Sequence, residues 1–201
     1  MPKAFDDAEK QAIRLAMMAA GLKHFERAGL RAARVDDICR DVGIAKGSFY
    51  AFFASKEDLF MAIVEAREEQ HRHDMLAFIE SASGAPARQV ARFFDLILRK
   101  IETDPILNLV VASNEIQYLT RKLGPERFAQ SQADDRAFTR DVAKRWKASA
   151  GIAIDAADLL DLMAICLSVA VQRAQMAPAQ YKSATALLRE LFVMRLVGGR
   201  P

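Results

Sequence analysis

The chain has 201 residues, of which 52% are hydrophobic and 27% charged, and its formal net charge is +3. This length supports one or two domains with a well-buried core, and no run approaches the ~20 apolar residues that span a bilayer. The only cysteines, Cys39 and Cys166, exclude a disulfide framework and fit a reducing compartment. The polar first ten residues lack the apolar core of a secretion signal, so we expect a cytoplasmic protein with no membrane partner.

The excess positive charge lies near the N-terminus. Residues 1–56 hold ten Lys and Arg against seven Asp and Glu, whereas residues 57–201 hold nineteen of each. A basic excess is a weak footprint of phosphate binding, and an ordinary solvated surface would look the same. The charge therefore agrees with a nucleic-acid partner without establishing one.

The first predicted helix begins at a capping Asp6 or Asp7 and runs to about Ala28, where Gly29 ends it. Its apolar residues recur at helical spacing and indicate one buried stripe. His24 lies in that stripe, and we interpret it as a partly buried, hydrogen-bonded histidine rather than a pH sensor.

A second, short helix is predicted after residue 34. Val35, Ile38 and Val42 place an apolar face on it. Gly43 then ends it, because glycine adopts the left-handed backbone conformation at no steric cost. The turn that follows leads directly into another short helix.

This third helix is predicted from Lys46 to Phe52. Phe49 and Phe53 are four residues apart and form its inner side, which leaves the polar side outward. Two short helices joined by such a turn form a helix-turn-helix unit, whose second helix enters the major groove of DNA.

The segment VDDICRDVGIAKGSFYAFFASKEDL, residues 35–59, resembles the TetR family of bacterial regulators. The matching features are the Gly-apolar turn, Lys-Gly-Ser-x-Tyr, and Phe-x-Ser-Lys-Glu-x-Leu. The resemblance covers roughly the first 60 residues and implies an all-α fold of about nine helices. It implies an N-terminal three-helix helix-turn-helix DNA-binding domain at residues 1–56, and a larger C-terminal helical bundle for ligand binding and dimerisation at residues 57–201.

The resemblance also implies which side chains contact DNA: Arg34, Lys46, Gly47, Ser48, Tyr50 and Lys56. Gly47 lets the backbone approach the groove, and Ser48 can bond a base edge or a phosphate. Lys56 would meet phosphate at the start of the next helix. Arg34 stands where the family commonly has a capping Ser or Thr, so it offers an ionic phosphate contact, unless it is merely exposed.

Helical periods continue to the C-terminus without the alternation typical of strands. Ser55 and Asp58 form a helix start signal, and SASGAP at residues 81–86 reads as a linker. The predicted helical segments are residues 59–83, 87–103, 105–123, 126–150, 155–176 and 179–197.

Catalytic and metal sites find little support. Glu69 and His73 are four residues apart and share a helix face, but His71 points elsewhere, so we predict no metal and no cofactor. The chain has no Ser/His/Asp arrangement and no glycine-rich phosphate loop, so we predict that it is not an enzyme.

The helix predicted at residues 155–176 is apolar nearly all round. Such a helix must be covered on more than one side, either by the core or by another chain. The resemblance implies a homodimer whose C-terminal helices form a four-helix bundle. A dimer would place two recognition helices about one DNA turn, ~34 Å, apart on a palindrome.

The resemblance further implies a small-molecule pocket in the helical body. A mostly apolar effector with one or two polar groups would suit its candidate lining, although each residue taken alone also fits ordinary core packing. We predict that a polar substitution at Tyr118 or Trp146 alters the ligand response more than DNA affinity. The candidates are Phe94, Ile97, Leu107, Val111, Asn114, Gln117, Tyr118, Trp146 and Cys166.

The sequence thus predicts a ligand-responsive repressor that binds a palindromic DNA operator as a homodimer and is released by a small, mostly apolar effector. Two alternatives stay open: a DNA-binding dimer without an effector, and a transcriptional activator. Thermal shift against a metabolite library would separate the effector-free reading from the first.

Overall fold

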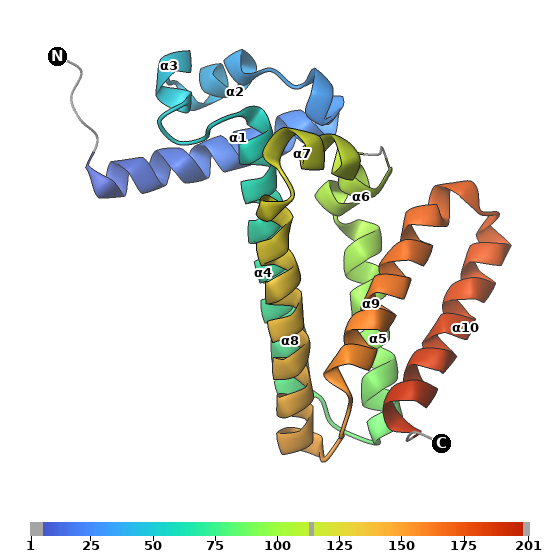
Figure 1. Cartoon of the computed structure of the whole chain (residues 1–201). Coiled ribbons are helices and arrows are strands. Elements are labelled where there is room, and N and C mark those ends of the chain that lie inside the picture. Colours follow the sequence, from blue (N-terminus) through green and yellow to red (C-terminus); the bar gives the residue numbers. More distant parts are fainter. Residues whose placement is uncertain (1–5, 113–114, 199–201) are drawn as a thin grey trace. The chain divides into compact units, whose positions relative to one another are not determined.

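The computed structural model describes residues 6–112 and 115–198, and within these ranges it contains only helices and their connections (Figure 1). The all-α prediction is confirmed. The helices are α1 (Asp7–Ala32), α2 (Val35–Val42), α3 (Lys46–Phe49), α4 (Lys56–Ser81), α5 (Pro86–Thr103), α6 (Pro105–Ala112), α7 (Glu115–Leu123), α8 (Glu126–Ala150), α9 (Ala156–Val171), the 3-10 helix η1 (Gln172–Gln175) and α10 (Pro178–Val197). The sequence predicted one segment at residues 105–123, and the structure has two helices there.

The chain divides into two compact units. The N-terminal unit comprises Met1–Arg67 and Pro105–Pro125, and the C-terminal unit comprises Glu68–Asp104 and Glu126–Pro201. Helix α4 contributes its first half to one unit and its second half to the other. The functional boundary after residue 56 stays a prediction.

Helix α1 begins as predicted and continues further than predicted. Asp6 caps it, because its side chain accepts a hydrogen bond from the Glu9 backbone N–H while the Glu9 side chain accepts from the Asp6 N–H. Gly29 leaves the helical conformation with φ 78°, but the chain resumes one helical turn to Ala32. Gly29 therefore makes a kink in the helix where the sequence predicted its end.

The helix-turn-helix segment has the predicted order with a shorter second helix. Gly43 has φ 75° and its N–H bonds back to the Arg40 carbonyl, which ends α2. Helix α3 ends at Phe49 rather than Phe52. Residues 50–52 form tight turns, because the N–H groups of Ala51 and Phe52 bond carbonyls three residues back.

Aromatic side chains hold the N-terminal unit together. Phe25 of α1 and Phe60 of α4 meet edge to face with ring centroids 5.1 Å apart, and Phe49 packs on Phe53 at 5.9 Å. Gly21 brings α1 and α4 close, since a Cβ there would lie 2.9 Å from a Leu59 methyl carbon. Of the predicted core positions in this segment, Ile38, Phe49 and Phe53 are buried, whereas Val35 and Val42 are half-buried. Helix α1 also packs against α6.

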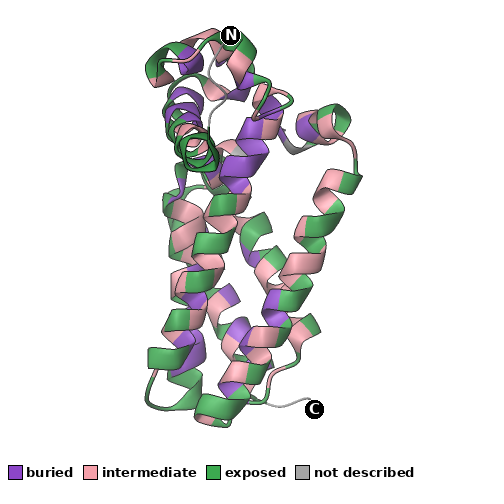
Figure 2. Ribbon diagram, turned by 90° about the vertical axis from the view of Figure 1, so that its left-hand side faces the viewer, coloured by how far each residue is buried: buried purple, intermediate pink, exposed green. Residues whose placement is uncertain are grey.

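The C-terminal unit is built on α5, α8, α9, α10 and the second half of α4. Phe93 and Trp146 stack edge to face at 4.8 Å, and Phe94 meets Phe192 at 5.4 Å. Figure 2 shows buried and exposed residues alternating along most helices, as expected of amphipathic helices that cover a core.

The C-terminal end of α9 differs from expectation. At the other end Asp155 caps the helix, accepting from the Ala157 N–H at 2.8 Å. The helix ends at Val171, and the remaining residues to Gln175 form the tighter η1.

Within residues 6–112 and 115–198, no helix combines the length and apolar character needed to cross a membrane.

Candidate functional site

The short helix α3 displays polar groups on an open surface. Tyr50, at its C-terminal end, is 53% exposed, and Lys46 and Gly47 are exposed as well. A Cβ on Gly47 would meet nothing within 4 Å, so the space in front of the backbone is free for a ligand to approach. Phe49 is fully buried beneath this surface and fixes which side of the helix faces outward.

Lys46 is already paired with a carboxylate of the neighbouring helix. Its ammonium lies 3.1 Å from Asp36 of α2. Both side chains are about half exposed, so the pair contributes little to stability and exchanges readily for a phosphate contact. Ser48 lies two residues further along the same short helix and is half-buried.

An arginine of α1 holds the turn after α3. Arg14 of α1 donates from Nη1 to the Phe52 carbonyl oxygen at 3.3 Å. Its guanidinium also lies 4.4 Å from the centroid of the Phe53 ring, within the range of a cation–π contact. Arg14 thus fixes where α3 ends, and no local pattern could have revealed a contact between residues 38 apart in sequence.

Lys56 points to the backbone in this structure. Its Nζ donates to the carbonyl oxygens of Arg31 at 2.7 Å and Ala33 at 3.1 Å, at the end of α1. The predicted start signal of α4 is confirmed, since the Asp58 N–H donates to Ser55 Oγ at 3.1 Å. The Lys56 ammonium has a third N–H donor, which leaves it able to bind a phosphate as well. That phosphate contact stays a prediction.

The N-terminus of α2 lacks a side-chain cap, as expected from its sequence. Arg34 occupies the cap position, makes no capping hydrogen bond and is exposed. Asp36 and Asp37 in the first turn offset part of this loss through the helix dipole. The Arg34 guanidinium is free to extend from the unit, and its phosphate contact stays a prediction.

Two side chains behind the motif, His24 and Cys39, are buried. His24 is buried, and its Nε2 lies 2.8 Å from Asp41 Oδ2, which confirms a hydrogen-bonded histidine. Cys39 is buried, and burial and then the nearby Asp36 carboxylate raise the pKa of its thiol. Cys39 is therefore a packed side chain rather than a redox switch.

Four of the predicted effector-binding residues meet in the core of the C-terminal unit: Phe94, Ile97, Trp146 and Cys166. Trp146 is fully buried, and its indole Nε1 has no hydrogen-bond partner among the residues that the structure describes. A buried donor without an acceptor costs free energy, so this group favours an additional acceptor. Burial raises the pKa of the Cys166 thiol to about 12, which keeps it neutral.

The other five predicted effector-binding residues fall within the residue range of the N-terminal unit. Leu107 is half-buried on α6 and Gln117 is exposed on α7. Tyr118 of α7 donates its hydroxyl to Glu57 Oε1 at 2.6 Å. Val111 lies on α6, but its side chain is outside the described part of the structure, as is all of Asn114.

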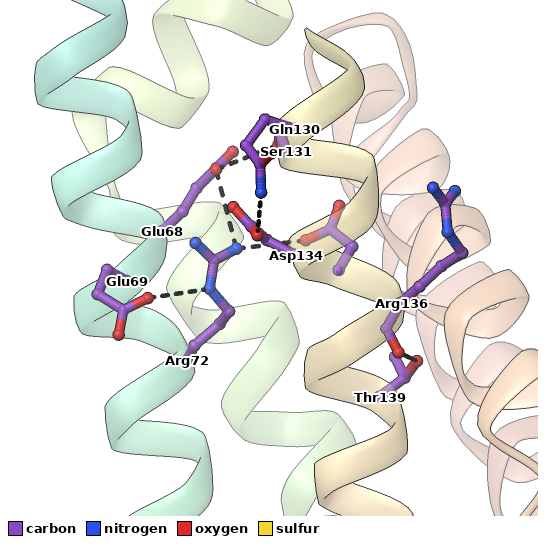
Figure 3. A network of polar contacts seen from close by, with 9 residues as sticks. Glu68, Glu69, Arg72, Gln130, Ser131, Asp134, Arg136 and Thr139 are labelled. Carbon is purple, nitrogen blue, oxygen red and sulfur yellow. Dashed lines mark hydrogen bonds and ion pairs between the residues drawn. The ribbon is translucent and has the colours of Figure 1, made fainter.

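A charged cluster joins the second half of α4 to α8 in the C-terminal unit (Figure 3). The Arg72 side chain is 15% exposed and lies 3.3 Å from Asp135, 3.4 Å from Glu69 and 3.9 Å from Glu68. Burial is the main cause that raises the pKa of Asp135, and the Arg72 guanidinium opposes it. Helical spacing hints at the contacts within α4, whereas the contact with α8 required the structure.

An apolar face is left uncovered on α10 and α9. Leu187, Leu191 and Met194 recur at helical spacing and are 58%, 46% and 62% exposed. Ile165 and Leu167 of α9 are also exposed. The helix predicted to need cover on several sides therefore lacks it within one chain.

The three N-terminal helices, the left-handed glycine turn and the exposed polar face of α3 define a helix-turn-helix DNA-binding domain. Residues 17–63 match the family model described as bacterial regulatory proteins, tetR family. The N-terminal quarter of the chain therefore carries the DNA-binding domain of the TetR family of bacterial transcription regulators.

Among curated proteins, the chain is similar to the transcriptional regulator AcuR of Cereibacter sphaeroides. The two are 38% identical over 50 residues, and the match spans 25% of this chain and 23% of AcuR. The likeness in sequence is therefore confined to about a quarter of each protein.

Solved structures resemble the whole fold. A TetR-family regulator from Pectobacterium atrosepticum superposes with a TM-score of 0.72 at 19% identity, over 98% of this chain and all of that one. The regulator FadR of Bacillus subtilis, solved with stearoyl-CoA, gives 0.62 at 15% identity over 92% of this chain and 99% of FadR. At these identities the likeness establishes the fold alone.

Proposed function

We propose that this chain is a repressor that binds a palindromic DNA operator as a homodimer and leaves it when a small, mostly apolar effector binds. The observation that carries the proposal is the exposed polar face of α3 above a buried Phe49. On this face Lys46, Gly47, Ser48 and Tyr50 are available to phosphates and base edges. We propose Arg34 and Lys56 as further phosphate contacts.

The homodimer is supported by the uncovered apolar side chains of α9 and α10. Exposed large apolar side chains of this kind are typical of protein–protein contact. Since α9 and α10 pack against each other within the C-terminal unit, two copies can form a four-helix arrangement. A single short recognition helix makes few base contacts, so two copies on one palindrome supply the affinity and specificity.

The effector is supported by the chemistry of the C-terminal core. Phe94, Ile97 and Cys166 supply apolar contacts, and the buried indole N–H of Trp146 can donate to one polar atom of a ligand. A long acyl chain with a polar group is one compound of this class, and stearoyl-CoA is bound in the Bacillus subtilis FadR structure. Leu107, Val111, Asn114, Gln117 and Tyr118 are further candidates from the sequence.

The proposal is tested by selecting duplexes from a random-sequence library with the purified chain. We expect an enriched palindrome, a complex containing two chains per duplex, and affinity that falls steeply with salt. Failure to enrich any sequence, together with a monomer at micromolar concentration, would contradict both the operator and the homodimer.

The effector is tested separately by thermal shift with a metabolite panel that includes stearoyl-CoA. A compound that raises the melting temperature and lowers affinity for the selected duplex identifies an effector. If none of the panel shifts melting while DNA binding persists, an effector-free DNA-binding dimer becomes the better description. A reporter gene placed behind the selected duplex separates repression from activation.

A further inference from the structure

A group of polar contacts in the N-terminal unit links α7 to the helices of the DNA-binding motif. Tyr118 of α7 donates its hydroxyl to Glu57 Oε1 of α4 at 2.6 Å. Glu57 is only 8% exposed, so its carboxylate depends on partners that replace water. This hydrogen bond, then burial, raises the pKa of the Tyr118 phenol, which keeps it a donor at neutral pH.

A second contact joins α7 to the short turn of helix that follows the kink in α1. Arg31 Nε lies 3.4 Å from the carboxylate of Glu115, which is 5% exposed at the N-terminus of α7. The Arg31 guanidinium also lies 4.9 Å from the centroid of the Tyr118 ring. One side chain of α1 therefore contacts two residues of α7.

These contacts converge on the corner where α1 turns into α2. The Arg31 and Ala33 carbonyl oxygens both accept from Lys56, the residue next to Glu57 in the first turn of α4. The chain then enters α2 within two residues of Ala33. The corner that sets the direction of α2, and through it of α3, is thus held by α4 and α7 together.

We infer that Tyr118 and Glu115 are positioning residues for DNA recognition: they fix the α1–α2 corner and so complete the reading surface, although they contact no DNA themselves. This inference rests on the proposed function. It gives Tyr118 a part in the DNA-bound state that the predicted effector contact did not include. It also explains why residues 105–125 belong to the same compact unit as residues 1–67.

The experiment compares two tyrosines that make the same kind of bond. Tyr118→Phe removes only the hydroxyl given to Glu57 and keeps the ring beneath Arg31. The matched control is Tyr181→Phe in the C-terminal unit, where Tyr181 donates to Glu102 Oε1 at 2.7 Å. Both changes remove one hydrogen bond from a tyrosine to a carboxylate, so similar losses of melting temperature are expected.

Binding is measured to the duplex selected by the wild-type chain and to an unrelated duplex of equal length. We expect Tyr118→Phe to weaken binding to the selected duplex about tenfold and to the unrelated duplex less than about twofold. Tyr181→Phe should leave the ratio of the two affinities unchanged. Glu115→Gln should lower the ratio in the same direction as Tyr118→Phe, by a smaller factor.

An unchanged ratio in Tyr118→Phe and Glu115→Gln, with wild-type DNA selection intact, would overturn the inference and leave the proposed function standing. Equal losses of the ratio in Tyr118→Phe and Tyr181→Phe would also overturn it, because general destabilisation would then explain both. If the wild-type chain selects no duplex at all, the proposed function fails and the inference fails with it.

Discussion

The two units of the chain expose opposite kinds of side chain. Around α3 the N-terminal unit exposes Lys46 and Tyr50 and buries the phenylalanines beneath them. The C-terminal unit exposes Leu191 and its neighbours on α10, and it keeps Arg72 largely buried between α4 and α8. An exposed lysine is well solvated without a partner, whereas exposed leucines lower the free energy by meeting another apolar surface. The comparison therefore supports the proposal that the first surface binds DNA and the other binds a second copy of the chain.

The largest effect is expected when charges are placed on the exposed apolar face of α10. The double substitution Leu187→Glu with Leu191→Glu is expected to give a monomer, because two carboxylates cannot be buried between identical faces. Loss of the second recognition helix should weaken binding to the selected duplex at least about a hundredfold. Light scattering after gel filtration and a binding titration measure the two effects.

The control for this prediction is Leu15→Glu. Leu15 is 55% exposed on α1, so it tests whether any exposed leucine has the same effect. We expect this variant to remain a dimer. If the double variant stays a dimer, or if Leu15→Glu becomes a monomer, the proposal that α9 and α10 form the self-association surface is wrong.

A second change tests the charge held inside the C-terminal unit. Arg72→Met leaves the carboxylates of Glu68, Glu69 and Asp135 without their shared cation. We expect a loss of about 2 kcal/mol in unfolding free energy, below the ~3–5 kcal/mol of a fully buried pair because these carboxylates are partly exposed. Urea unfolding measures it.

Arg145→Met is the matched control for Arg72→Met. Arg145 also pairs with carboxylates, Asp141 and Glu80, but its side chain is 39% exposed. Exposed pairs contribute little, so this variant should be close to wild type in urea. Equal losses in the two variants would show that burial does not distinguish the Arg72 cluster.

A third, smaller effect is expected at the polar face of α3. Lys46→Ala should weaken binding to selected and unrelated duplexes by a similar factor, up to about tenfold, and reduce the salt slope by about one. Lys182→Ala, an exposed lysine of α10, should change neither quantity. A selective loss of the selected duplex alone would instead make Lys46 a base-reading residue.

The smallest effect concerns acid stability. Asp74 accepts hydrogen bonds from Lys100 at 2.5 Å and from Gln70 at 2.8 Å, and these, the Lys100 bond first, lower its pKa below 3.8. The unfolded chain therefore binds more protons near pH 4, so this stabilisation is present above that pH and is lost on acidification. Asp74→Asn should flatten the stability profile between about pH 5 and pH 3 and leave its slope at neutral pH unchanged.

Asp7→Asn provides the control for that profile. Asp7 forms the same kind of pair with Lys10 at 3.1 Å, but its side chain is 99% exposed. We expect the acid limb of Asp7→Asn to follow that of the wild-type chain, measured by urea unfolding at each pH. If the unfolding free energy of Asp74→Asn falls as steeply with acidification as that of the wild-type chain, the Lys100 contact does not have this role.

Local signals were sufficient for most of the fold. The Asp6 and Asp155 caps, the Gly43 turn and the buried Phe49 all follow from residues close together in sequence, and the structure confirms each. The errors concern helix ends, such as α3 stopping at Phe49 and α9 at Val171. Tight turns with bonds three residues back carry nearly the same pattern as a further helical turn, so periodicity cannot separate them.

By itself the sequence determined the helix-turn-helix motif and the all-α fold, because glycine geometry, capping and helical period act within a few residues. The residues of the motif also carried the resemblance to the TetR family. Only the tertiary structure decided that Tyr118 meets Glu57, 61 residues away, that Lys56 closes the α1–α2 corner, and that Arg72 reaches α8. Contacts of this kind depend on which helix faces pack together, and a hydroxyl or guanidinium in a helical pattern is compatible with many partners.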